Sequence, residues 1–96
     1  MSQPTWQVQE DQGGRWRDFP EALRQQVEIQ YMEWAKSGRL GELVVEFIWP
    51  NAKQTSFTPY EIHCRMVDGS MEYYQINVLT QHRRAVRRFW IMDEIM

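Results

Sequence analysis

Four arginines lie close together near the end of this 96-residue chain, at positions 83, 84, 87 and 88. Residues 80–92 hold these four basic side chains and no acid, whereas residues 1–79 hold seven basic and eleven acidic side chains. Guanidinium groups donate paired hydrogen bonds to phosphate and carboxylate oxygens. The stretch therefore predicts a site for phosphate, such as a diphosphate. The acidic remainder argues against a general nucleic-acid binder, which spreads basic charge over a whole face.

The same arginines also have a purely structural interpretation. A strand that carries several basic side chains can be a solvated sheet edge that resists pairing with another chain. Composition alone favours this edge interpretation. Within a strand, alternation places Arg84 and Arg88 on one face and Arg83 and Arg87 on the other, so only one pair can face a given pocket.

Cysteine and histidine chemistry is the second candidate. Cys64 is the only cysteine, and the histidines are His63 and His82. His63 is adjacent in a predicted strand, so its side chain points to the face opposite Cys64. No glycine motif follows to stabilise an oxyanion, and no Cys/His cluster has the spacing of a zinc site. The sequence therefore predicts no catalytic residue, metal or cofactor, and Cys64 is expected to be a small buried apolar group.

One helix is predicted, over residues 19–36. Its apolar residues recur at helical spacing, at Leu23, Val27, Tyr31 and Trp34. Asp18 and Glu21 have the spacing of a capping box, and Pro20 falls in the first turn, where its missing N–H costs little. Gly38 is the predicted left-handed stop.

About six short strands are predicted around this helix. A first pair, residues 6–9 and 15–17, flanks a turn-forming stretch. Four more lie at residues 43–49, 60–67, 71–78 and 85–91, with a polar loop at 52–59. Asp68-Gly69 is a strong hairpin signal between the strands that it separates. A single helix covering one face of a curved antiparallel sheet, with the strands in meander order, is an α+β fold.

Three kinds of side chain have specific predicted places. Trp6 and Trp16 flank the first turn and are expected to pack on the helix, with Trp16 also bordering a pocket. Glu28 lies beside the buried helix stripe and needs a partner, such as an arginine of the last strand. Gln75 lies on the strand face opposite Tyr74, which leaves its amide free for a pocket.

Length and composition indicate one domain over residues 1–96, with a core from about 5 to 91. The chain is 43% hydrophobic and 14% aromatic, which excludes a disordered chain. No apolar run is long enough to span a bilayer. The first residues lack the basic and apolar regions of a signal peptide, so we expect an intracellular protein, cytoplasmic or nuclear, with no membrane partner.

Residues from both halves of the chain follow the order of a known family. In the first half they are Trp6-Gln7-Val8, Glu10, Gly14, Trp16, Phe19 and Glu28. In the second half they are Tyr60-Glu61-Ile62, Tyr74-Gln75-Ile76-Asn77, Thr80 and Arg84-Ala85-Val86-Arg87-Arg88. In this order they resemble the WWE domain, a family named for two tryptophans and a glutamate. The resemblance covers residues 6–89, nearly the whole chain.

This resemblance implies a half-barrel of about six antiparallel strands packed on one helix. It also implies a non-catalytic module that binds ADP-ribose-type ligands: the iso-ADP-ribose unit of poly(ADP-ribose), a terminal ADP-ribose, or ATP. WWE domains occur in ubiquitin ligases and ADP-ribosyltransferases, so the implied partners are ADP-ribosylated proteins and other domains of such enzymes. The implied ligand contacts are Gln7, Trp16, Tyr60, Gln75 and Arg84, with Arg87 or Arg88 assisting phosphate binding or stabilising the fold.

Two other functions stay open at this point. One is a protein–protein adaptor with the same fold and no nucleotide. The other is a single-stranded RNA binder that uses aromatic and arginine side chains. The resemblance favours ligand binding over both, and over the interpretation of the arginine strand as a plain edge.

Overall fold

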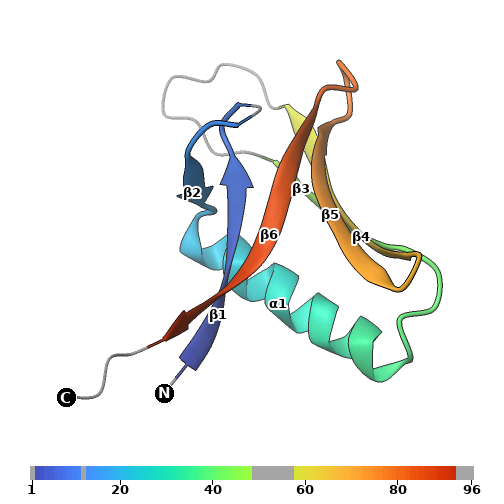
Figure 1. Cartoon of the computed structure of the whole chain (residues 1–96). Coiled ribbons are helices and arrows are strands. Elements are labelled where there is room, and N and C mark those ends of the chain that lie inside the picture. Colours follow the sequence, from blue (N-terminus) through green and yellow to red (C-terminus); the bar gives the residue numbers. More distant parts are fainter. Residues whose placement is uncertain (1, 12, 49–57, 93–96) are drawn as a thin grey trace.

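One helix and six strands make up the part of the chain that the structure describes, which is residues 2–11, 13–48 and 58–92 of a computed structural model (Figure 1). In chain order they are β1 (Ser2–Gln9), β2 (Trp16–Asp18), α1 (Glu21–Lys36), β3 (Leu43–Ile48), β4 (Pro59–Val67), β5 (Ser70–Asn77) and β6 (Arg83–Met92). The strands form one antiparallel sheet in the order β2-β1-β6-β5-β4-β3. The predicted α+β half-barrel on one helix is confirmed.

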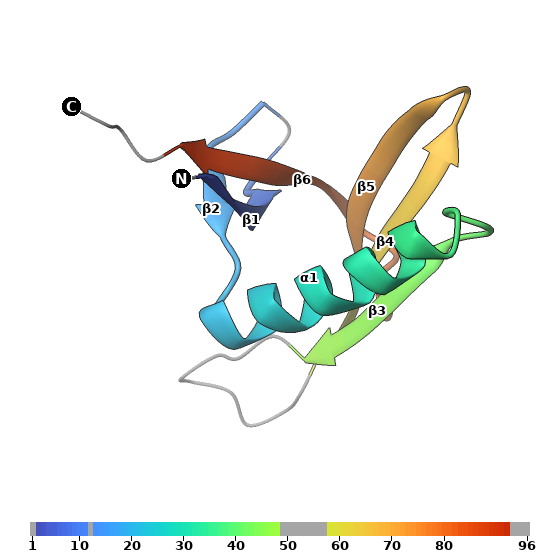
Figure 2. The ribbon, with the colours of Figure 1, turned by 90° about the horizontal axis from the view of Figure 1, so that it is seen from below.

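The sheet departs from the predicted meander at one place. The strands β3 to β6 follow one another, but the hairpin of β1 and β2 lies beyond β6. The strand β6 changes partner along its length, because residues 83–85 pair with β5 and residues 86–92 pair with β1. Figure 2 shows β6 connecting the two sides of the curled sheet, with α1 across the concave side. The meander prediction was wrong here because β1 finds its partner 80 residues away, with Gln7 opposite Arg87.

The ends of α1 agree with the prediction only in part. The helix begins two residues after the predicted start and ends at the predicted residue. The capping box does not form, because Asp18 still belongs to β2 and Pro20, which has no side-chain cap, precedes the first helical residue. The predicted stop is confirmed: Gly38 has φ +95°, and its N–H donates to the Ala35 carbonyl at 3.1 Å.

The hairpin between β4 and β5 is also confirmed. Asp68 and Gly69 have φ values of 51° and 83°, the left-handed geometry that tight hairpin turns need. Residues 52–57 of the predicted polar loop lie outside the described residues. No helix in the described part of the chain is long and apolar enough to cross a membrane.

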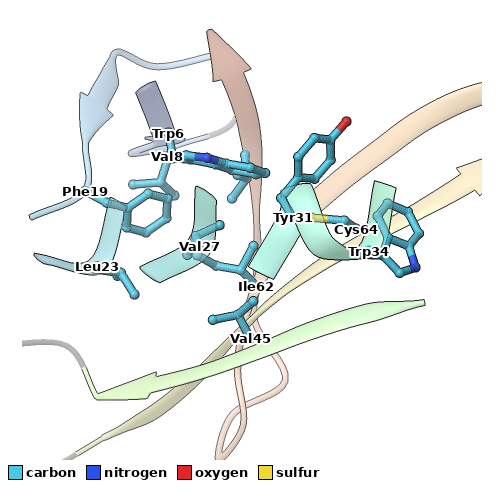
Figure 3. Packing of buried hydrophobic residues seen from close by; sticks show 11 residues of the cluster. Trp6, Val8, Phe19, Leu23, Val27, Tyr31, Trp34, Val45, Ile62 and Cys64 are labelled. Atoms are coloured by element: carbon cyan, nitrogen blue, oxygen red, sulfur yellow. The ribbon is translucent and has the colours of Figure 1, made fainter. Parts of the chain in front are cut away.

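The core fills the space between α1 and the concave face of the sheet (Figure 3). Its fully buried side chains include Trp6, Val8, Phe19, Val27, Val45, Ile62 and Cys64. The predicted helix stripe is confirmed, since its four apolar residues are all buried. Trp6 meets the ring of Tyr31 edge-on, with 5.4 Å between the ring centres. Each large apolar side chain buried here contributes about 1.5–3 kcal/mol, so the sheet is held in its curl around the helix.

Candidate ligand-binding site

A cavity of about 360 Å³ opens on the concave side of the sheet, and we call it the inner cavity. It is lined by Val8, Glu10, Asp11, Arg17, Tyr60, Gln75 and Arg84. These residues come from five strands and the turn between β1 and β2, and none belongs to α1. The inner cavity therefore brings together three residues that were predicted as ligand contacts, Tyr60, Gln75 and Arg84.

Gln75 is the deepest polar residue of this set. It is 5% exposed, and its Oε1 atom is buried without a hydrogen-bond partner among the described residues. It lies between Ile62 of β4 and Arg84 of β6 in the register of the sheet. A buried carbonyl oxygen without a partner costs about 1–3 kcal/mol. A ligand that presents an N–H or O–H group to this oxygen would recover that free energy.

Arg84 provides positive charge at the edge of the inner cavity. Its Nη1 atom lies 3.5 Å from Oδ1 of Asp11, whose side chain is 86% exposed. An ion pair this exposed contributes at most about 1 kcal/mol, because water and salt screen it. The guanidinium group of Arg84 can therefore exchange this carboxylate for a ligand phosphate at little cost.

Tyr60 gives the inner cavity an aromatic wall. Its ring is stacked on that of Phe47, with 5.6 Å between ring centres and 21° between planes. Phe47 in turn meets the buried ring of Phe19 edge-on at 5.9 Å. The wall is thus continuous with the core, which keeps the Tyr60 ring in a fixed orientation for stacking against a planar group.

Three charged lining residues were not predicted as ligand contacts. The sequence places Glu10 and Asp11 in the first turn, with Glu10 also in the family pattern, and Arg17 in a short strand. Arg17 faces the inner cavity because it pairs with Val8, whose side chain points to the concave side. Its Nε atom lies 3.9 Å from Oε1 of Glu10. The register of the first hairpin would have identified Arg17, but no sequence signal fixes that register.

Three predicted contacts lie on the other face of the sheet. Trp16 pairs with Gln9 rather than Val8, so it faces away from α1. Contrary to the prediction, it neither packs on the helix nor lines the inner cavity. Its ring lies under the guanidinium group of Arg87, 4.3 Å from the ring centre. The Nε atom of Arg87 donates to Oε1 of Gln7 at 2.8 Å. Arg87 therefore contacts both Gln7 and Trp16 on this face, and a role for the three residues in ligand binding stays a prediction.

Arg88 shares a strand face with Arg84 but has a structural partner. Its Nε and Nη2 atoms donate to the two carboxylate oxygens of Glu28 at 2.9 and 2.7 Å. Trp6 Nε1 also donates to Glu28, at 2.9 Å. Burial raises the pKa of Glu28, but the hydrogen bonds from Arg88 and Trp6 outweigh this and hold the pKa below its ordinary value. The predicted pairing of Glu28 with an arginine of the last strand is confirmed.

The environment of Cys64 disfavours the thiolate form of its side chain. Cys64 is fully buried, and burial together with the charge of Glu42 raises the pKa of the thiol to about 12. His63 points to the outer face of the sheet, as predicted, where its Nε2 atom lies 2.8 Å from Glu61 Oε1. Within residues 2–11, 13–48 and 58–92, no group of three His, Cys, Asp or Glu side chains is arranged to hold a metal ion.

Comparisons with protein-family models, with curated proteins and with solved structures found no match to this chain. A functional inference must therefore come from the inner cavity and from the residue pattern itself.

Proposed function

We propose that this chain is a non-catalytic binding module for ADP-ribose-type ligands. The observation that carries the proposal is the inner cavity, in which Tyr60, Gln75 and Arg84 converge from β4, β5 and β6. The order of residues that resembles the WWE domain supports the same class of ligand. The volume of the inner cavity, about 360 Å³, lies at the lower end of the range for small-molecule sites, so the cavity suits one part of such a ligand.

Each of the three side chains has a distinct role in this proposal. Arg84 binds a phosphate oxygen with its guanidinium group, in place of Asp11. The Oε1 atom of Gln75 accepts a hydrogen bond from an amino or hydroxyl group of the base or ribose. The ring of Tyr60 stacks against the planar base. None of these roles requires a covalent bond to be made or broken, so the module binds its ligand without catalysing a reaction.

Calorimetric titration tests this proposal directly. Wild type, Arg84→Ala and Arg84→Lys are titrated with ADP-ribose, iso-ADP-ribose, ATP and a short RNA. Loss of a charge-assisted contact weakens binding by about ten- to a hundredfold, so Arg84→Ala should bind at least tenfold more weakly. Arg84→Lys should recover only part of the affinity, because an ammonium group cannot replace the paired donors.

Arg65→Ala is the matched control for charge. Arg65 lies on the outer face of β4 and pairs with Glu72 at 3.0 Å, so its removal should leave affinity unchanged. Circular dichroism confirms that each variant is folded. Equal affinity of wild type and Arg84→Ala would remove Arg84 from the site. Binding to RNA alone, with a steep loss of affinity as salt rises, would favour the RNA interpretation instead.

A protein–protein adaptor is the second candidate, and one surface favours it. Ile29, Met32 and Trp90 are exposed apolar side chains, and a groove of about 530 Å³ lies beside Ile29 between α1 and β1. Arg88 links two of them, because its guanidinium group lies 4.8 Å from the Trp90 ring centre and 3.9 Å from Met32 Sδ. Failure of wild type to bind any nucleotide would move the assignment to this adaptor role.

A further inference from the structure

A second cavity lies where β6 changes partner. The ladder between β1 and β6 extends only to Val8 opposite Val86, and from Ala85 back to Arg83 the strand pairs with β5. Beyond this point β1 and β6 are no longer paired, and a cavity of about 260 Å³ lies there. We call it the outer cavity. It is lined by Gln9, Asp11, His82, Arg83, Arg84 and Ala85.

The inner and outer cavities share two residues. Asp11 and Arg84 line both of them, and their exposed ion pair of 3.5 Å is the contact that the cavities have in common. Gln9, Arg83 and Ala85 alternate with Val8 and Arg84 along their strands, so they belong to the opposite face of the sheet. A ligand that displaces Asp11 from Arg84 can therefore extend from one face of the sheet to the other.

The two cavities differ in charge. In the inner cavity two arginines are matched by Glu10 and Asp11. In the outer cavity Arg83 and Arg84 face only Asp11 among the acidic side chains of the lining, with His82 beside them. Arg83 lies over the ring of Tyr74, 4.4 Å from its centre, which leaves the N–H edges of the guanidinium group directed away from the ring. The excess positive charge therefore favours an anion in the outer cavity.

We propose that the outer cavity binds a second diphosphate of an extended ligand, whose first diphosphate contacts Arg84 from the inner cavity. This inference rests on the proposed function and narrows its ligand. A chain of linked ADP-ribose units carries a diphosphate in each unit and supplies two diphosphates, whereas a single ADP-ribose supplies only one. Arg83 and His82 are then the residues that distinguish the oligomer from the single unit.

Titration with two ligands tests the outer cavity. ADP-ribose and an oligomer of three ADP-ribose units are titrated into wild type and Arg83→Gln. A charge-assisted contact is worth about tenfold or more in affinity, so Arg83→Gln should bind the oligomer about tenfold more weakly than wild type does. Its affinity for ADP-ribose should stay within about twofold. Each comparison titrates the same ligand into two proteins. The number of binding units in the oligomer therefore does not change the ratio of the two affinities.

Arg65→Gln is the matched control. It removes the same charge and the same kind of contact with Tyr74, since Arg65 lies 5.7 Å from that ring centre. Its affinity for both ligands should equal that of wild type. Circular dichroism establishes that both variants are folded. An equal loss for the oligomer and for ADP-ribose, or no loss for either in Arg83→Gln, would overturn the outer site.

A probe that is not a nucleotide separates this inference from the proposed function. Pyrophosphate is titrated into isotope-labelled wild type, and the amide signals are followed by NMR. We expect shifts centred on Gln9, His82 and Arg83 that disappear in Arg83→Gln. If neither ADP-ribose nor the oligomer binds wild type, the proposed function fails, and these shifts alone decide whether the outer cavity is an anion site. Absence of the shifts in wild type, or their persistence in Arg83→Gln, rejects it.

Discussion

Replacing Glu28 by alanine should destabilise the fold strongly and leave the inner cavity unchanged. The Glu28 carboxylate accepts three hydrogen bonds, two from Arg88 and one from Trp6, and these tie α1 to β6 and β1. The side chains of Arg88 and Glu28 are 12% and 25% exposed, so the pair is largely shielded from water. Removing the carboxylate leaves the guanidinium group of Arg88 and the buried indole N–H of Trp6 without their acceptor.

The size of the effect follows from this geometry. Removing one partner of a buried ion pair costs about 3–5 kcal/mol, and the partial exposure of Glu28 places it at the lower end, about 3 kcal/mol. For a domain of this length each kcal/mol lowers the melting temperature by about 4–8 °C, so Glu28→Ala should melt about 12–24 °C below wild type. Glu28→Gln should lie between the two, because an amide oxygen keeps one acceptor without the charge.

Urea unfolding and thermal unfolding, both followed by circular dichroism, measure the free energy of unfolding and the melting temperature. Glu33→Ala is the matched control, because Glu33 is an exposed glutamate of the same helix and its replacement makes the same change in helix propensity. The double variant Glu28→Ala/Arg88→Met should be more stable than Glu28→Ala, since it no longer buries an unpaired charge. If Glu28→Ala and Glu33→Ala had equal stability, the hydrogen-bonded cluster would have no structural role and the reasoning would be refuted.

Two further predictions concern titration and reactivity. The pKa of Glu28 is lowered in the folded state, so its contribution to stability is complete above the ordinary glutamate value of 4.5 and is lost as pH falls through the lower folded value. Unfolding of wild type and Glu28→Gln across pH 2–7 should show their difference in stability shrinking at the acid end, and a constant difference would contradict this. Cys64 should react with a thiol reagent at pH 8 only as fast as the protein unfolds, because its pKa is about 12 and its side chain is buried. Cys64→Ala should cost at most about 2 kcal/mol and leave ligand affinity unchanged, and fast labelling of the native protein would show that the thiol is accessible.

Local patterns predicted most of the elements correctly. The helix stripe from Leu23 to Trp34 and the Asp68-Gly69 turn depend on periodicity and on turn geometry within a few residues, and both are confirmed. Strand alternation also separated Arg84 and Arg88 from the other two arginines of β6. The charge of Glu28 beside a buried stripe was enough to predict a partner, because a carboxylate in that position needs one.

Long-range pairing is the part that the sequence could not provide. Nothing near β1 indicates that Gln7 will lie opposite Arg87, and this pairing determines which arginine reaches which neighbour. The three-residue strand β2 is too short for a pattern to set its register, so Trp16 was expected in the pocket where Arg17 lies. The charge balance of the inner cavity was missed for the same reason, because turn residues acquire a role only once the turn is placed.

The sheet is complete only when its last strand, β6, is paired on both sides. Among the described strands, β6 alone pairs with both β1 and β5, so the two sides of the sheet are joined only through residues 83–92. Closing a loop of 80 residues carries a large entropy cost, whereas the hairpin of β4 and β5 closes locally. We therefore expect the docking of β1 onto β6 to be the slow step of folding, because it needs contacts between residues far apart in the chain. Until that step, the facing edges of β1 and β5 present unpaired backbone groups that invite pairing with another chain, which makes the partly folded chain the form most exposed to aggregation.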